Sequence, residues 1–480
     1  MMRRERRRKR QNPTPNISRV PPDDGLCSSR RLLLFFACSL LTLACKPTPA
    51  PVPTSLKVDI AGISGATGTV TITSSDGKID CPARCGPAGY SIGATVTVTA
   101  HPALGAEVVG WSLPCTGSGN DCTFKPAGAQ RLNVTFGPPH LNRLFITSSN
   151  YTGSQIGGLS GADALCNAHA RAAKLPGQFS AFLSTASVNA VDRFAGKSGW
   201  IRADGRPVTD TLAATVSPAP QMFYFAAADE WGHLSSGSSL GSYWTGSSLS
   251  GKYVSGKTCG DWTQDDSEGL AGNVDIQTWV GYASASCSTP LPLLCLGTDF
   301  TSQLPLTPNP VAGRTAFVSQ NSFDPGTGLL GADALCAQEA KTSGLSGTFL
   351  ALLSTPSAGA AARFDALGSP WVRPDGVAVV EEAADLFTGK QWLLAPLSLN
   401  ADKTYKSELE VITGGGGPGN SLGGPTNLGT ISGTCNNWTG KSESTATNGI
   451  VGSPDKWFEV NTNSSCAPGL GSARIYCLEQ

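Results

Sequence analysis

Several short segments near the start of the chain alternate between apolar and polar residues. They lie at 56–60 (LKVDI), 68–72 (GTVTI), 95–99 (TVTVT) and 132–136 (LNVTF). A period of two is typical of β-strands that have one buried face and one solvated face. Gly, Asp and Ser residues between the segments supply turns. We therefore predict a small all-β domain over residues 55–138, called the β domain below.

The rest of the chain contains one pattern twice. The sequence GADALC occurs at 161–166 and 331–336, and 14 of 25 positions are identical between 161–185 and 331–355. Further matches follow in the same order, at Arg193-Phe194 and Arg363-Phe364, Trp200 and Trp371, the CxxW motifs of 259–262 and 435–438, and Trp279 and Trp457. We predict two homologous domains joined by a Pro-rich linker: copy 1 (143–298), the linker (299–313) and copy 2 (314–480).

A helix is predicted near the start of each copy. Ser160 is suited to cap the first helix, and Asp163 then falls in its first turn, where a carboxylate meets free backbone amides and the helix dipole. Copy 2 has Leu330 in place of Ser160 but keeps the acid as Asp333. A catalytic acid is the alternative, and we favour the role at the helix start. The apolar segment 347–353, like its counterpart in copy 1, predicts a buried strand.

The first 45 residues have the features of an export signal. A basic pair precedes a largely apolar run over 32–43. Such a run before a small residue is typical of a signal peptide, and it is shorter than the roughly 20 residues that span a bilayer. The tetrapeptide 42–45 (TLAC) resembles the bacterial lipobox, which implies a signal peptide over 1–44 and a lipid on Cys45. The alternative is an ordinary signal peptide with Cys45 as a bystander.

A proline-rich stretch follows the export signal. Proline stands at every second position from 47 to 53, so residues 45–54 are expected to form a stiff, extended spacer.

Charge and composition narrow the class of partner and the class of fold. The basic stretch 1–10 allows nucleic-acid binding or a discarded leader, and we favour the leader. The formal net charge is zero, so we expect no nucleic-acid partner. The 57 glycines, 33 prolines and 15% charged residues favour loop-rich β structure.

The chain has 15 cysteines, which is typical of an oxidising compartment. Removing Cys27 and Cys38 with the leader and Cys45 as the lipid site leaves three groups of four. They are Cys81, Cys85, Cys115 and Cys122; Cys166, Cys259, Cys287 and Cys295; and Cys336, Cys435, Cys466 and Cys477. Even sets predict disulfides, whereas the separations 166 to 259 (93 residues) and 336 to 435 (99 residues) do not suit zinc. The neighbouring cysteines of the first group are expected to close local loops.

Two family resemblances follow from these motifs. The β domain, with its CxxxC, Gly-Trp and second cysteine pair, resembles the internalin-type B-repeat of bacterial surface proteins. The pattern GADALC…LxGxFxAxLS…CxxW, with a last cysteine-bearing strand, resembles the endostatin-like domains of bacterial outer-membrane proteins. That resemblance implies an α+β, C-type-lectin-like fold in both copies. It also implies nested disulfides, namely Cys166–Cys295 with Cys259–Cys287, and Cys336–Cys477 with Cys435–Cys466.

Little in the chain points to catalysis or to a cofactor. The histidine cluster of endostatin's zinc site and the Glu-Pro-Asn, Gln-Pro-Asp and Trp-Asn-Asp motifs of calcium-dependent lectins are missing. The chain has four histidines and copy 2 has none, which excludes a duplicated histidine-based site. His169 lies on the predicted helix opposite Glu339 of copy 2, and we expect it to be solvated. We predict no enzyme and no cofactor.

The ligand-binding candidates lie in copy 1. Asp265, Asp266 and Glu268 gather in the Cys259–Cys287 loop, where calcium is one interpretation and a solvated polar loop the other. Several tryptophans recur beside framework cysteines and are expected to pack in the core. Trp244 has Pro425 or Thr426 at the place we assign to it in copy 2. It is therefore the tryptophan that we favour for stacking on a sugar or anchoring a protein.

The order of these parts predicts a function. We expect a lipid-anchored protein of the cell envelope, at the outer membrane or surface of a Gram-negative bacterium. Its partners would be the membrane, through the lipid, and an extracellular protein or glycan. Adhesion without catalysis is the favoured interpretation. The alternative is a structural component of the envelope or extracellular matrix with no specific soluble ligand.

Overall fold

The computed structural model describes residues 55–63, 71–91, 93–102, 106–112, 114–115, 119–127, 129–137, 139–234, 242–304, 310–387, 392–406, 410–416, 423–440, 445–460, 463–466 and 474–480. The predicted signal peptide (1–44), lipidation site (Cys45) and spacer (45–54) lie outside these residues. Among the residues described, no helix has the length and apolar character needed to cross a membrane.

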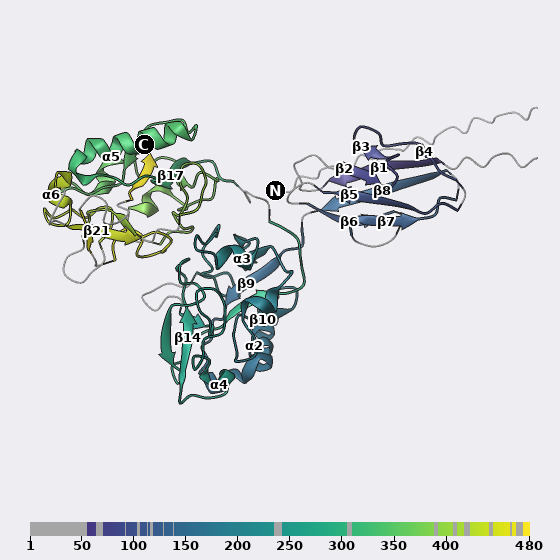
Figure 1. The fold of residues 1–480 in the computed structure, drawn as a ribbon, viewed down its shortest axis with the longest axis horizontal. Coiled ribbons are helices and arrows are strands. Elements are labelled where there is room, and N and C mark those ends of the chain that lie inside the picture. The colour runs from purple at the N-terminus through teal and green to yellow at the C-terminus, as the bar shows by residue number, and fades with distance from the viewer. Residues whose placement is uncertain are drawn as a thin grey trace, which may run out of the picture. The chain divides into compact units, whose positions relative to one another are not determined.

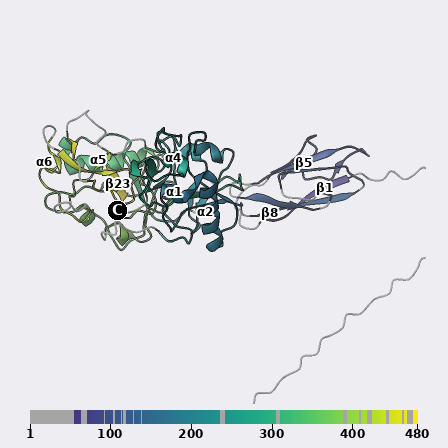
Figure 2. The ribbon, with the colours of Figure 1, turned by 90° about the horizontal axis from the view of Figure 1, so that it is seen from below.

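The β domain consists of two four-stranded sheets, ordered β4-β1-β8-β6 and β3-β2-β5-β7. Its strands, which run alongside one another in Figures 1 and 2, are β1 (Ser55–Ile63), β2 (Thr71–Ser74), β3 (Asp80–Cys81), β4 (Ala88–Gly89), β5 (Val96–His101), β6 (Glu107–Trp111), β7 (Asp121–Phe124) and β8 (Gln130–Gly137). Ile72 and Val98 from one sheet share a core with Leu132 and Val134 from the other, and none of the four is exposed. The predicted alternation therefore buries one face of each sheet.

Copy 1 is built on a five-stranded sheet ordered β10-β16-β9-β11-β12 and a three-stranded sheet ordered β13-β14-β15. Its elements are β9 (Asn142–Ile146), α1 (Gly153–Ile156), α2 (Gly158–Ala172), β10 (Phe179–Ala181), η1 (Val191–Phe194), β11 (Trp200–Arg202), β12 (Pro207–Thr209), α3 (Leu212–Thr215), β13 (Tyr243–Trp244), α4 (Cys259–Trp262), β14 (Glu268–Gly272), β15 (Ala283–Ser286) and β16 (Leu294–Gly297). The helix α2 lies beside β10 (Figure 1).

Copy 2 repeats this plan with sheets ordered β18-β23-β17-β19 and β20-β21-β22. Its elements are β17 (Arg314–Val318), η2 (Pro325–Thr327), α5 (Gly328–Thr342), β18 (Phe349–Ala351), η3 (Ala360–Arg363), β19 (Trp371–Val372), η4 (Ala383–Leu386), β20 (Glu410–Ile412), α6 (Cys435–Trp438), β21 (Thr445–Ile450), β22 (Asn463–Ser465) and β23 (Tyr476–Glu479). The predicted α+β class is confirmed, as a fold rich in sheet with few helices.

The first and last strands of each copy pair in the same register. Phe145 of β9 faces Cys295 of β16, and Phe317 of β17 faces Cys477 of β23. The cysteine of the last strand is bonded to the helix in both copies, as Cys166–Cys295 and Cys336–Cys477. The second disulfides are Cys259–Cys287 and Cys435–Cys466, and the β domain has Cys81–Cys85 and Cys115–Cys122. All six predicted pairings are confirmed.

The prediction that Asp163 starts the helix is wrong. The helix α2 begins at Gly158, its N-cap is Gly157 rather than Ser160, and its first turn holds no acidic residue. Asp163 lies one turn further on and accepts hydrogen bonds from the amide of Ala181 (2.9 Å) and from Arg193 (2.6 Å). Asp333 does the same in copy 2. The duplicated acid therefore joins the helix to the next strand and to a duplicated arginine.

The CxxW motifs form left-handed turns. All eight residues of α4 and α6 have φ between 49° and 67°. This conformation costs an L-residue about 1–2 kcal/mol, so it persists only where tertiary contacts impose it. The cysteine at the start of each turn is held by a disulfide, and the tryptophan at its end donates from Nε1 to a carbonyl 2.8 Å away, that of Ser184 or Ser354.

These disulfides close loops of different length, which predicts different contributions to stability. Cys166–Cys295 encloses 129 residues and Cys259–Cys287 encloses 28. In the loop-entropy description, replacing either pair with alanine lowers the free energy of unfolding by about 2–5 kcal/mol, and the longer loop costs about 1 kcal/mol more. Urea unfolding followed by circular dichroism would measure this. Replacing Cys336 and Cys477, which close the long loop of copy 2, should lower the free energy of unfolding about as much as replacing the long-loop pair of copy 1. A larger loss of stability for the short loop would contradict the prediction.

Candidate functional site

Trp244 lies in the core, so the expectation that it meets a ligand is wrong. Its side chain is 0% exposed, its Nε1 donates to the carbonyl of Tyr151 at 2.8 Å, and its ring lies 5.7 Å from that of Trp262. The assignment of Pro425 or Thr426 as its counterpart is also wrong. Tyr243 faces Gly272 as Val411 faces Gly449, so the next residue along, Ile412, takes the place of Trp244 in copy 2.

The predicted acidic candidates do not converge on one site. The carboxylate of Asp265 accepts hydrogen bonds from the amide (2.8 Å) and hydroxyl (2.6 Å) of Ser154, and these bonds lower the pKa of Asp265. Glu268 pairs with Lys257, while Asp266 is exposed. Within the described residues, no three His, Cys, Asp or Glu side chains are grouped to hold a metal ion. The geometry gives calcium no support in this loop.

His169 joins a buried polar network, so the expectation that it is solvated is wrong. Its side chain is 13% exposed, its Nδ1 lies 2.6 Å from Glu230 Oε1, and its Nε2 lies 2.7 Å from the hydroxyl of Tyr151. Glu230 is 2% exposed and also accepts hydrogen bonds from the amide (2.9 Å) and hydroxyl (2.5 Å) of Ser148. Burial tends to raise the pKa of Glu230, but these hydrogen bonds outweigh it and lower the pKa to about 2.

Copy 2 satisfies the same backbone with a carboxylate from another element. Glu339, on the helix in the place of His169, accepts from the amides of Gln320 (2.8 Å) and Asn321 (2.7 Å). The place of Glu230 is taken by Ala401, which is buried. The acid has therefore moved from the turn to the helix, while its role of satisfying buried amides is unchanged.

The network of copy 1 anchors a tight turn at residues 229–233. Asp229 Oδ1 accepts from the amides of Trp231 and His233, both at 2.9 Å, and the amide of Asp229 donates to the carbonyl of His233 at 2.9 Å. Gly232 has φ +85° and lies against the backbone of Asp204, so a side chain there would be strained and crowded. With Glu230 buried beside it, the turn is fixed from both sides.

This turn exposes an aromatic side chain. Trp231 is 54% exposed, and it is the only exposed residue among the ten tryptophans of the chain, all of which are described. Leu234, just beyond the turn, is 46% exposed, and the side chain of His233 is 78% exposed and lies 3.4 Å from Asp229. The backbone of this exposed indole is already rigid, so binding a partner would cost little further conformational entropy.

The equivalent turn of copy 2 has the same backbone and different chemistry. The amide of Asn400 donates to the carbonyl of Thr404 at 2.9 Å, as Asp229 does to His233. Asp402 and Lys403 stand in the places of Trp231 and Gly232, and both are exposed. The fold thus presents an aromatic turn on one copy and a charged turn on the other.

Trp231 was not among the candidates predicted from the sequence. The available signal was its setting in Asp229-Glu230-Trp231-Gly232-His233, since Asp and Gly three residues apart favour a turn and turns lie at the surface. The tryptophans that recur beside framework cysteines are core residues, and so is Trp244.

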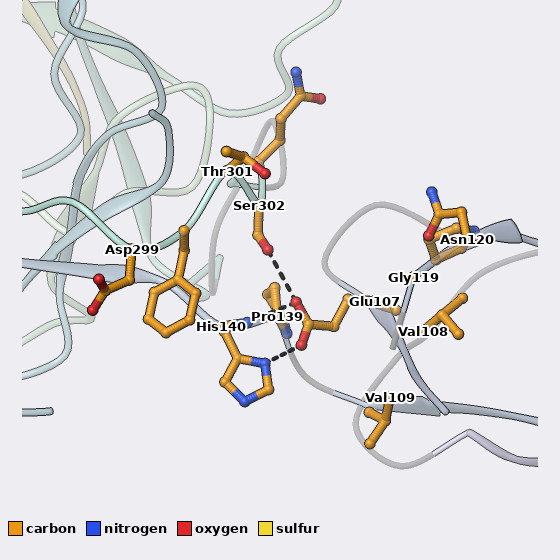
Figure 3. Close-up of a pocket in the computed structure, with 14 residues that line it drawn as sticks. Glu107, Val108, Val109, Gly119, Asn120, Pro139, His140, Asp299, Thr301 and Ser302 are labelled. Carbon is orange, nitrogen blue, oxygen red and sulfur yellow. Dashed lines mark hydrogen bonds and ion pairs between the residues drawn. The ribbon is translucent and has the colours of Figure 1, made fainter. Parts of the chain in front are cut away.

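A cavity of about 650 Å³ is lined by part of β6, by Pro139 and His140, and by residues 299–303. Its carboxylate, Glu107, accepts hydrogen bonds from the His140 amide and the Ser302 hydroxyl, both at 3.0 Å, and pairs with the His140 ring (Figure 3). Burial tends to raise the pKa of Glu107, but these hydrogen bonds outweigh it and lower that pKa. The carboxylate is thus engaged by the chain itself.

No protein-family model matches the chain, and the comparison with curated proteins also finds no match.

The shifted pKa of Glu230 predicts how acid affects copy 1. The folded pKa of about 2 lies below the value near 4.3 of an unfolded glutamate, so the stabilisation is complete above about pH 4.3 and is lost as the pH falls toward 2. Glu230→Gln should lower the free energy of unfolding by about 1–3 kcal/mol at pH 7, and by progressively less as the pH falls below about 4.3.

Calorimetric melting of both proteins between pH 7 and pH 2 would measure this difference. Asp266→Asn, which alters an exposed acid of the same copy, is the matched control and should leave the melting temperature unchanged. A gap between wild type and Glu230→Gln that stayed constant down to pH 2 would contradict the assignment.

Proposed function

We propose that the chain is an exported, lipid-anchored surface protein that binds an extracellular protein or glycan, without catalysis, through the Trp231 turn of copy 1. The single observation that carries this proposal is the exposed indole of Trp231 on a backbone fixed by Asp229, Glu230 and Gly232. Burying such a side chain in a partner removes a large apolar surface from water.

Physical chemistry supports recognition at this turn. Tryptophan is among the residues that most often dominate binding energy, because it combines a large rigid apolar surface with an N–H donor. Leu234, just beyond the turn, is exposed as well, and His233 and Asp229 add polar side chains to the same turn. A ligand that offers an apolar face edged by hydrogen-bonding groups suits this arrangement.

We further propose that both copies are endostatin-like domains of the C-type-lectin-like type, preceded by an internalin-type B-repeat. Three features support this: the pairing of first and last strands, the disulfide from the helix to the last strand, and a second sheet closed by its own disulfide. In this proposal the β domain is a spacer and Cys45 is the membrane anchor, at the outer membrane or surface of a Gram-negative bacterium.

The proposed site predicts the effect of removing the indole. Residues 46–480 and the variant Trp231→Ala would be applied to arrays of glycans and matrix proteins, and saturable binding should weaken by about 30-fold, the scale of a binding hot spot. Asp402→Ala, at the equivalent place in copy 2, should leave binding unchanged.

Binding that survives Trp231→Ala would contradict the proposed site. Failure of the wild-type protein to bind any array member would favour the structural role in the envelope.

The lipid anchor has a separate test. Cys45→Ala should abolish incorporation of radiolabelled palmitate, and it should move the protein from the membrane fraction to the soluble fraction of the cell, because the thioether-linked lipid is what retains it. Cys38→Ala is the matched control and should change neither readout. Labelling that persisted in Cys45→Ala would contradict the proposed anchor.

A further inference from the structure

Equivalent segments of the two copies lie against each other. Phe223 donates its amide hydrogen to Val208, as Leu394 does to Val379, so these two residues occupy the same place in their copies. Tyr224, next to the first, packs in one buried cluster with Val377, Leu394 and Ala395 of copy 2. Its hydroxyl also accepts a hydrogen bond from the amide of Ala378 at 3.3 Å.

The hydrogen bonds across this contact are nearly reciprocal. Phe225 donates its amide hydrogen to the carbonyl of Leu394 at 3.3 Å. The reciprocal donor would be Pro396, which has no N–H. The carbonyl that would have received this bond, that of Phe223, instead accepts from the Arg373 guanidinium at 3.3 Å, and Met222 accepts from the same nitrogen at 2.7 Å. A side chain of copy 2 thus fills the place of a missing backbone donor.

A second pair of equivalent turns also meets. The amide of Asn273 donates to Thr278 as that of Ile450 donates to Lys456, and the turn of copy 2 is one residue longer. Asp275 and Ser453 each lie three residues before the end of their turn. Asp275 Oδ1 accepts from the hydroxyl of Ser453 at 2.8 Å, and both residues are buried. Next to them the amide of Ile276 donates to the carbonyl of Gly452 at 3.1 Å.

The apolar core is continuous across the same contact. Buried residues of both copies belong to one cluster, among them Phe225, Ile276 and Val280 of copy 1 and Val380, Leu393 and Val451 of copy 2. A contact in which each surface meets its own equivalent is isologous, the kind that relates subunits of a twofold-symmetric dimer.

We propose that this face is an isologous docking surface whose partner is a second copy of the same domain, so that the chain is a covalently joined homodimer of its domain. The inference goes beyond ligand binding and does not depend on the Trp231 turn. The duplication then has a structural reason, because each copy covers the apolar face of the other.

The first test asks whether the copies hold together without the linker. The starting protein would be residues 46–480 with a protease site inserted into the linker at 305–309. The protease would then cleave this folded chain between the two copies. The two fragments should elute together in size-exclusion chromatography at about 10 µM. Separation of the wild-type fragments while circular dichroism shows both folded would overturn the proposal.

Arg373 and Arg202 give a matched pair of variants. Both guanidinium groups are buried, bind the aspartate two residues on, and reach a carbonyl of their own copy, but only Arg373 also reaches carbonyls of the other copy. Arg373→Met should weaken association of the cleaved fragments by about tenfold or more, and Arg202→Met should not. Equal effects of the two substitutions would overturn the proposal.

A cross-link tests the twofold relation and does not require a buried arginine to be replaced. In the chain that carries Asp275→Cys and Ser453→Cys, oxidation should join the fragments after cleavage into one band on a non-reducing gel, which reductant divides. A control with Asp266→Cys and Ser453→Cys should give two bands. Failure of the first pair to cross-link in folded protein would show that equivalent positions do not meet, and would overturn the proposal.

Discussion

The disulfide between the helix and the last strand is the constraint on which each copy depends. It joins residues 129 positions apart in copy 1 and 141 apart in copy 2, and in both the bonded strand pairs with the first strand of the domain. The two ends of each domain are thereby fixed side by side. What lies between them is mostly short strands and irregular loops, and the cross-link restricts the conformations that this long segment would have in the unfolded chain.

A fixed frame allows strained and variable segments within it. The left-handed CxxW turns persist because a disulfide holds one end and a tryptophan bonded to a core carbonyl holds the other. The turns at 229–233 and 400–404 share a backbone and differ in what they expose, an indole in one copy and charged groups in the other. Because the two turns have the same backbone and different exposed side chains, one copy of a duplicated scaffold can carry a binding site that the other lacks.

The two copies also keep contacts while exchanging the groups that make them. Buried amides are satisfied by Glu230 in copy 1 and by Glu339 in copy 2, from different elements. At the contact between copies, Arg373 supplies the hydrogen bond that Pro396 cannot. In both cases a buried backbone N–H or C=O needs a hydrogen-bond partner, because leaving it unpaired costs free energy. Which side chain provides that partner matters less.

The sequence by itself determined four of the eight strands of the β domain, the duplication and the α+β class, because periodicity and internal identity can be read along the chain. Family resemblance added the nested disulfides. Only the tertiary structure decided which tryptophan meets solvent. Trp244 is buried by bonding to Tyr151, 93 residues away, whereas Trp231 is exposed because Asp229 and Gly232 fix its turn. Asp163 likewise found its partner 30 residues on, in Arg193. The burial of Trp244 and the pairing of Asp163 depend on distant segments that no local pattern encodes, whereas the turn that exposes Trp231 is made by its immediate neighbours.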